Sequence, residues 1–357
     1  MLQTRSADIA VIYDSEPACN AVVSALSGYF VYRKIPLEKY AIGGSRDATL
    51  NIFCASMDDK AAIGQVKKAI KICQDEILFV LPTHNSDRIS QLRQHSEADY
   101  FLLPLDAEKF RGAVKSALNR PIEKSWSALE PAKRKALKSA VVSFEKCFDQ
   151  VANGQPIPMD DIVSSCQHIR EAAELGGLDS WINALDDHHD YSFRHSMFVC
   201  GSLTYFAQAI GIRDAELDQL TLGGLLHDIG KCRVPLDILD KPGKLDTRQW
   251  EVMKQHPVHS QEIMDRENDM DADLMAMAVY HHEKLDGTGY PEGLSNSQIN
   301  DHVRLTAIAD VYSALIDKRA YKGSMTSEMA LEIMVTLEDE LDMDLVHEFR
   351  SFTLDKG

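Results

Sequence analysis

The periodicity of apolar residues changes once along the chain, at about residues 120–130, and this change restricts the fold more than any other feature. Before it, short apolar runs alternate with helical patterns. Four runs are typical of buried strands: Ile9 to Tyr13, Leu50 to Cys54, Ile77 to Leu81 and Tyr100 to Leu103. Such alternation predicts a parallel sheet covered by helices. From Glu130 onward, apolar residues recur at three- and four-residue spacing, which predicts helices alone.

The first region resembles a response-regulator receiver domain in its strand spacing and in the segment ADYFLLPLDAEKF, which leads into a helix. The resemblance implies a receiver-like (flavodoxin-like) parallel α/β sheet over residues 1–122. We expect a helical linker, with the first helices of the next domain, over residues 123–180. The remaining residues, 181–357, are expected to form an all-α bundle.

The receiver resemblance does not extend to phosphorylation chemistry. A working receiver carries carboxylates after its first and third strands and a lysine after its fifth. Here Asp14 follows the first strand, residues 48–57 contain no carboxylate, and Leu103 stands in place of the lysine. Only a longer third strand would bring in Asp58 or Asp59. We therefore expect a degenerate receiver that forms a homodimer or contacts a protein partner.

Composition excludes several classes of partner. The formal net charge of −17 opposes binding of long DNA or RNA, which depends on many basic contacts to phosphates. No apolar run approaches the ~18 residues of a membrane-spanning helix, and no secretory leader is evident, so we expect a cytoplasmic protein without membrane insertion. The seven cysteines are scattered and never form C-x-x-C, which argues against disulfides and a cysteine zinc site.

Histidines are concentrated in the helical region, where eight of the thirteen fall between His188 and His282. Two pairs stand in distinctive settings. His227 and Asp228 are adjacent within GGLLHDIGK, and His281 and His282 are adjacent within VYHHEKLDGTGYP. Adjacent side chains on a helix point about 100° apart, so such a pair can serve two neighbouring metal ions.

These motifs resemble the HD superfamily of metal-dependent phosphohydrolases and, within it, the HD-GYP family. The matching segments run in the family's order over ~140 residues: DYSFRHS, LLHDIGK, KPGKL, HP, HHEKLDGTGYP, RLTAIADVYSAL and KRAYK. A single His-Asp pair would be weak evidence, whereas an ordered series of this kind is very specific. The resemblance implies that residues 181–357 form an HD-GYP helical bundle with phosphodiesterase activity.

The resemblance also implies a set of metal ligands. The first ion would be held by His195, His227, Asp228 and Asp310, and the second by His256, His281 and His282, with Asp228 bridging the two. Imidazole and carboxylate ligands suit iron or manganese, with zinc or nickel as alternatives. Family members with three metals carry a glutamate where this chain has Tyr191, so two divalent transition-metal ions are expected. Asp190, one residue earlier, would face a different direction.

Substrate contacts follow from the same resemblance. Asp228 and Lys231 are the expected catalytic residues, with Lys231 one helical turn beyond the bridging aspartate and directed at the scissile phosphate. The other residues expected to bind substrate are Gly289, Tyr290, Pro291, Arg319 and Lys322. An arginine suits planar, two-pronged contacts to a phosphate or a guanine edge.

The substrate implied is cyclic di-GMP, opened at a 3'-5' phosphodiester to pGpG and further to GMP. The chain departs from the family at Ser313, usually an aspartate that could pair with guanine, at Ala320, usually a proline, and at Ser260, usually a glycine. None of these removes a ligand. Two alternatives stay open: a non-enzymatic cyclic di-GMP sensor or interaction protein, and a phosphodiesterase for another cyclic dinucleotide such as cyclic GMP-AMP.

Overall fold

The computed structural model describes residues 9–43, 48–56, 60–73, 75–82, 90, 98–239, 241, 243–267, 269–317 and 325–355. The chain divides into two compact units, Met1–Lys124 and Ser125–Gly357. None of the described helices combines the length and the apolar character needed to span a bilayer.

The first unit is built on a five-stranded parallel sheet with the order β2-β1-β3-β4-β5. The strands are β1 (Ile9–Tyr13), β2 (Tyr32–Pro36), β3 (Leu50–Cys54), β4 (Glu76–Leu81) and β5 (Asp99–Leu102). The helices are α1 (Glu16–Leu26), α2 (Leu37–Gly43), α3 (Lys60–Ile72) and α5 (Ala107–Ser125). This strand order is that of flavodoxin-like folds, so the expected α/β class is confirmed.

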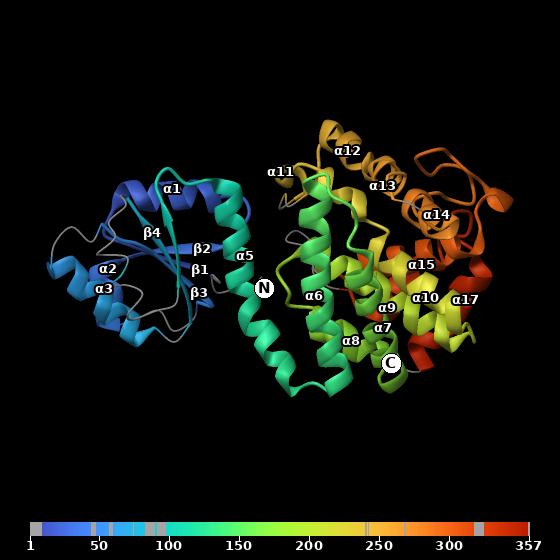
Figure 1. Ribbon diagram of the computed structural model, residues 1–357, viewed down its shortest axis with the longest axis horizontal. Coiled ribbons are helices and arrows are strands. Elements are labelled where there is room, and N and C mark those ends of the chain that lie inside the picture. The colour runs from blue at the N-terminus through green and yellow to red at the C-terminus, as the bar shows by residue number, and fades with distance from the viewer. Residues whose placement is uncertain are drawn as a thin grey trace. The chain divides into compact units, whose positions relative to one another are not determined.

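Alternating residues of each strand supply two cores. Ile9 and Val11 of β1 pack with α1 and α5 on one face, while Ala10 and Ile12 pack with α2 and α3 on the other. Figure 1 shows these helices flanking the strands. Central parallel strands are buried on both faces, which explains why their sequences are continuously apolar. The sequence pattern missed β2, Tyr-Arg-Lys-Ile-Pro, because an edge strand is only half-buried and tolerates charged residues.

The second unit is helical throughout its described residues, as expected. Its α-helices are α6 (Pro131–Ala152), α7 (Met159–Leu175), α8 (Leu178–Leu185), α9 (Tyr191–Ala209), α10 (Asp214–Leu226), α11 (Leu236–Leu239), α12 (Thr247–Met253), α13 (His256–Met264), α14 (Ala272–Tyr280), α15 (Asp301–Ile316), α16 (Ser327–Met334) and α17 (Met343–Asp355). Three short 3-10 helices are η1 (Trp126–Ala128), η2 (Ile229–Arg233) and η3 (Asn296–Gln298).

Helix α9 is the centre of this unit. Its residues from Phe193 to Ala207 are all buried, and it packs against α10 and α15 among others. A helix that is buried on every side must be surrounded by neighbours, and here these neighbours bring polar side chains toward one end of α9. Figure 1 places α9, α10 and α15 together in the middle of the second unit.

Candidate metal centre

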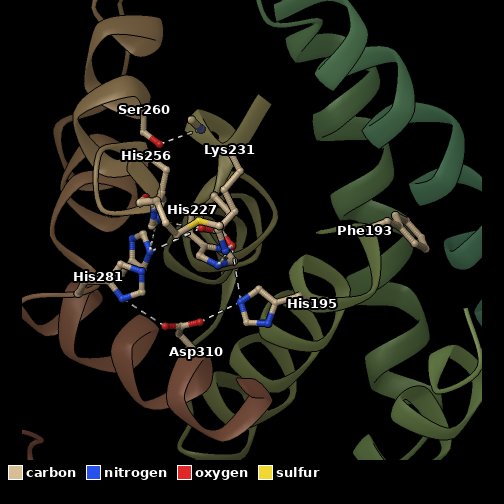
Figure 2. Close-up of polar contacts among 12 residues, drawn as sticks. Phe193, His195, His227, Lys231, His256, Ser260, His281 and Asp310 are labelled. Carbon is tan, nitrogen blue, oxygen red and sulfur yellow. Dashed lines mark hydrogen bonds and ion pairs between the residues drawn. The ribbon is translucent and has the colours of Figure 1, made fainter. Parts of the chain in front are cut away.

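The structure brings the seven predicted ligands together from separate parts of the chain (Figure 2). His195 lies on α9, His227 and Asp228 between α10 and η2, His256 at the start of α13, His281 and His282 after α14, and Asp310 on α15. We refer to these seven residues as the His–Asp cluster. Five of the seven stand at helix ends, where a change in chain direction lets adjacent side chains face a common point.

Asp228 lies at the middle of the cluster, and its two carboxylate oxygens face different histidines. Oδ2 lies 3.1 Å from His227 Nε2 and 3.5 Å from His195 Nε2. Oδ1 lies 3.2 Å from His256 Nε2 and 3.8 Å from His281 Nε2. One carboxylate therefore separates two sets of nitrogen atoms, as a residue bridging two ions would.

The ligand atoms also group as two adjoining sites require. Three groups each place all their candidate atoms within 4.8 Å of one another: His195, His227 and Asp310; His256, His281 and His282; and His227, Asp228 and His281. The second group has the three histidines expected for the second ion, the first has three of the four residues expected for the first ion, and the third contains Asp228 with one histidine of each set. Asp310 contacts both sets, since Oδ1 lies 2.9 Å from His195 Nε2 and Oδ2 lies 3.6 Å from His282 Nδ1.

Three of the rings are oriented by the backbone through Nδ1. This atom donates to a carbonyl three or four residues earlier: His227 to Gly224 at 2.9 Å, His256 to Met253 at 2.8 Å, and His281 to Met277 at 3.1 Å. A carbonyl can only accept, so Nδ1 carries the proton and Nε2 presents its lone pair to the cluster. The buried atoms His227 Nε2 and Asp228 Oδ1 have no hydrogen-bond partner within the described residues. This donor set fits a metal ion.

Burial keeps several imidazoles neutral. It lowers the pKa of His195, lowers that of His282 to about 3, and places that of His281 well below the ordinary value, where neighbouring rings add to the effect. A metal ligand must be the unprotonated imidazole, so these shifts favour metal binding at neutral pH.

The ring of Tyr191 stacks against the ring of His195, with centroids 5.8 Å apart and planes 9° apart.

The two carboxyl groups are held in the charged form. Burial would raise the pKa of Asp228, but His227 and Lys231 beside it hold the pKa well below its usual range. The pKa of Asp310 is lowered in the same way, because the contact with His195 outweighs burial. Burial would lower the pKa of His227, but the carboxylate of Asp228 raises it.

Lys231 reaches the cluster, as its place one turn after Asp228 predicts. Its ammonium donates to Asp228 Oδ2, and its backbone N–H donates to Asp228 O at 2.9 Å. The turn is tight at Gly230, where a Cβ would lie 1.9 Å from His256 O, so only glycine fits. Ser260 Oγ accepts from the Gly230 N–H at 3.0 Å (Figure 2). The departure at Ser260 therefore supplies a hydrogen bond to the turn that carries Lys231.

Glu283 is a site residue to which the sequence analysis gave no role, although it follows the histidine pair directly. Its carboxylate is buried and accepts from three successive backbone N–H groups, those of Glu292 and Gly293 to Oε1 at 2.7 and 3.0 Å and that of Leu294 to Oε2 at 2.9 Å. The sequence offered one indication of this role, since Glu283 is an acidic residue inside the motif HHEKLDGTGYP and precedes a glycine-rich loop.

These bonds hold the loop that contains Gly289, Tyr290 and Pro291. A Cβ on Gly289 would lie 2.5 Å from the Cα of Glu283, so the loop passes directly over the chain after the histidines. Tyr290 N–H donates to His282 O at 3.2 Å, and the two rings lie 4.7 Å apart. Gly289 and Tyr290 thus stand beside the cluster as expected, and Pro291 follows half-buried. Arg319, Ala320 and Lys322 lie outside the described residues.

Arg194 and Asp317 form a buried ion pair that the sequence did not predict. Arg194 Nε donates to Asp317 Oδ1 at 2.7 Å, and the aspartate is fully buried. The pair joins the start of α9, next to His195, to the end of α15, the helix that carries Asp310. Asp317 lies directly after α15, and nothing in the sequence pairs it with Arg194, which is 123 residues earlier.

Four other polar residues near the motifs belong to none of the three ligand groups. Asp190 caps α9 by accepting from the Phe193 N–H at 2.9 Å. His188 is buried with its ring 4.7 Å from that of Phe193. His259 belongs to none of the three ligand groups. Ser313 is fully buried, and its hydroxyl has no hydrogen-bond partner within the described residues.

Comparison with known families agrees with this geometry. The family model described as "HD domain" matches residues 179–345. Residues 179–345 are an HD domain. The match contains all seven members of the His–Asp cluster and the loop with Gly289 and Tyr290. The resemblance to this superfamily predicted from the sequence is therefore confirmed.

Two curated relatives share the HD domain. A cyclic di-GMP phosphodiesterase of Pseudomonas aeruginosa is 34% identical over 163 residues, which cover 46% of this chain and 39% of that protein. A 3'3'-cGAMP-specific phosphodiesterase of Vibrio cholerae is 35% identical over 178 residues, covering 50% of this chain and 36% of that protein. The chain thus spans less than two fifths of the length of each of these relatives.

A solved structure shares the fold. It is that of a HDG"Y"P protein from Bdellovibrio bacteriovorus, with a TM-score of 0.50 and 18% sequence identity. The match covers 70% of this chain and 81% of that one. At this identity the likeness concerns the fold alone.

Proposed function

We propose that this chain hydrolyses a 3'-5' phosphodiester of cyclic di-GMP to pGpG, and onward to GMP, at a centre of two divalent metal ions. The observation that carries the proposal is the division of the His–Asp cluster around Asp228, whose two oxygens face separate sets of imidazole nitrogens. The similarity to a cyclic di-GMP phosphodiesterase supports the choice of substrate. The catalytic domain would occupy residues 181–357, with residues 123–180 as its leading helices and linker.

The charge of the site supports a need for metal ions. With neutral imidazoles, two carboxylates and one ammonium leave the cluster negative, and the chain as a whole carries −17. Such a site would repel a phosphodiester, whereas divalent ions would reverse the local sign. Imidazole and carboxylate ligands favour iron or manganese, with zinc or nickel as alternatives. When bound, two such ions stabilise charge on the phosphate and activate water for attack.

The chain's own groups would position and neutralise the substrate. Lys231, whose ammonium contacts Asp228, would donate to a phosphate oxygen or give a proton to the leaving oxygen. Burial, with the nearby charges of Asp310 and Asp228, raises the pKa of Tyr290, so its phenol stays a neutral hydrogen-bond donor beside His282. Gly289 and Pro291 shape the loop, and Arg319 and Lys322 remain proposed as phosphate or guanine contacts.

The test is to remove metal with a chelator, reload it anaerobically with iron or manganese, and resolve products by chromatography. We expect close to two ions per chain, because Tyr191 replaces the third-site glutamate, and metal-dependent release of pGpG. A value near three would contradict the two-ion centre. Binding of cyclic di-GMP by the loaded protein without any cleavage would favour the sensor alternative.

A second candidate substrate is 3'3'-cGAMP. The similarity to a phosphodiesterase specific for it favours this candidate, and a metal centre acts on the phosphate whatever the base. Ser313, fully buried, offers no carboxylate to a guanine edge. Parallel assays of cyclic di-GMP, 3'3'-cGAMP and cyclic di-AMP decide between them by their kcat/KM values.

The receiver-like domain would act without phosphorylation, through a homodimer or a protein partner. Where a receiver carries its lysine, Leu103 packs against the apolar core that β1 shares with α1 and α5. Size-exclusion chromatography with light scattering tests the dimer; a monomer at micromolar concentration would leave a protein partner as the remaining route.

A further inference from the structure

One exposed aromatic side chain stands beside the loop that covers the His–Asp cluster. Trp250, on α12, is 45% exposed, whereas the other two tryptophans of the chain, Trp126 and Trp181, are buried. A single exposed apolar side chain is common in itself, so what matters here is which residues lie next to Trp250.

Trp250 is linked to the cluster through a series of ring contacts. The ring of Tyr290 lies 4.7 Å from that of His282, with planes 31° apart. The Trp250 ring lies 6.4 Å from that of Tyr290, edge to face at 79°. The indole is thus two aromatic contacts away from a candidate metal ligand. In a nucleotide, a base is separated from its phosphate by one ribose, so a base can reach this ring when its phosphate lies at the cluster.

Local hydrogen bonds fix the backbone that carries each of the two rings. Helix α12 begins with a capping box, in which Asp246 accepts from the Gln249 N–H at 2.9 Å and Gln249 accepts from the Asp246 N–H at 3.1 Å. The loop with Tyr290 is fixed by the three bonds to Glu283. A stacking surface formed before the ligand arrives loses little entropy on binding.

We propose that Trp250 is the stacking surface for a purine base of the cyclic dinucleotide. The proposal rests on the function proposed above and adds a base-binding subsite to it. Aromatic stacking suits this protein because its net charge gives no general attraction to nucleotides. Every base has a π face, so Trp250 strengthens binding of guanine and adenine alike and does not choose between cyclic di-GMP and 3'3'-cGAMP.

Steady-state kinetics of metal-loaded protein give the first test. Trp250→Ala should raise KM for cyclic di-GMP about tenfold, the size of one base–aromatic stack, with kcat within about twofold of the original protein. Trp250→Phe should restore most of the loss. Leu175→Ala, which removes another exposed apolar side chain, on α7, is the matched control and should change neither constant. An unchanged KM in Trp250→Ala would overturn the stacking role.

Tryptophan fluorescence gives a readout other than activity. In the slow Lys231→Ala background, cyclic di-GMP should quench the emission of Trp250 saturably, while Lys231→Ala/Trp250→Phe, which keeps only the buried Trp126 and Trp181, should show no change. Equal quenching in both proteins would refute the subsite. Failure of the unsubstituted, metal-loaded protein to cleave any cyclic dinucleotide would instead overturn the proposed function, so the two failures are distinguishable.

Discussion

Each unit of this chain brings an aspartate to a point where several elements end, but the two aspartates have different surroundings. Asp14 follows β1 at the carboxyl edge of the sheet, where its Oδ1 accepts from the Ser56 N–H at 2.7 Å, and the described end of β3 is Cys54-Ala55-Ser56. Asp228 is surrounded by imidazole nitrogens. Within the described residues directly after β1 and β3, the sheet offers one carboxylate, that of Asp14, whereas the helical unit brings seven candidate ligands together. A receiver-like strand order is therefore no evidence for receiver chemistry, which has to be judged from the residues at the site.

The largest effect should come from removing the residue at the centre of the second unit. Asp228→Ala should abolish hydrolysis, by at least about a thousandfold, and lower metal content, because it removes the carboxylate that lies between the two histidine sets. Metal analysis and product chromatography measure both defects. Asp301→Ala, which removes an exposed carboxylate at the start of α15, is the control and should retain both properties. Normal metal content in Asp228→Ala would argue against a bridging role.

Substitution of Lys231 tests whether positioning of the phosphate can be separated from metal binding. Lys231→Ala should keep both ions and reduce kcat roughly a hundredfold, the usual consequence of losing one charged donor to a reacting phosphate. Arg233→Ala is matched to it, since Arg233 lies on the same 3-10 turn but pairs with the exposed carboxylate of Glu262. Loss of metal from Lys231→Ala equal to that from Asp228→Ala would mean that the lysine is structural.

A smaller effect is expected at Glu283, whose carboxylate accepts from three backbone N–H groups of the loop. Glu283→Gln replaces one accepting oxygen by an amide that faces backbone N–H groups, an imbalance worth about 1–3 kcal/mol. We expect kcat/KM to fall about tenfold and the thermal midpoint to drop, with metal content unchanged. Glu283→Ala should be worse than Glu283→Gln. Reduced metal occupancy in either variant would show that the residue acts on the histidines rather than on the loop.

The sequence was informative where local pattern and chemistry coincide. Continuous apolar runs identified β1, β3 and β4 because central parallel strands are buried on both faces. Of the two edge strands, β5 was recognised from its apolar residues, and the half-buried, charged β2 carried no such pattern. The seven cluster residues could be named because the ordered motifs fix their spacing. The bond from Gly230 to Ser260 and the three bonds to Glu283 could not be predicted, since they depend on the three-dimensional approach of segments 9 to 30 residues apart.

Treatment with a phosphodonor should have the smallest effect, because we expect no phosphorylation of the receiver-like unit. Asp14 has its carboxylate engaged with the backbone after β3, and Leu103 contributes an apolar side chain where a receiver uses its lysine to transmit the signal. Asp58 and Asp59 lie outside the described residues, so a phosphodonor experiment is the most direct way to decide whether either of them accepts a phosphate. Incubation with acetyl phosphate and magnesium, followed by intact mass and phosphodiesterase assay, should give no added phosphate and no change in rate. A phosphate mapped to Asp14, Asp58 or Asp59, together with altered hydrolysis, would show that the first unit has kept its chemistry as well as its fold, and the contrast between the two units would no longer hold.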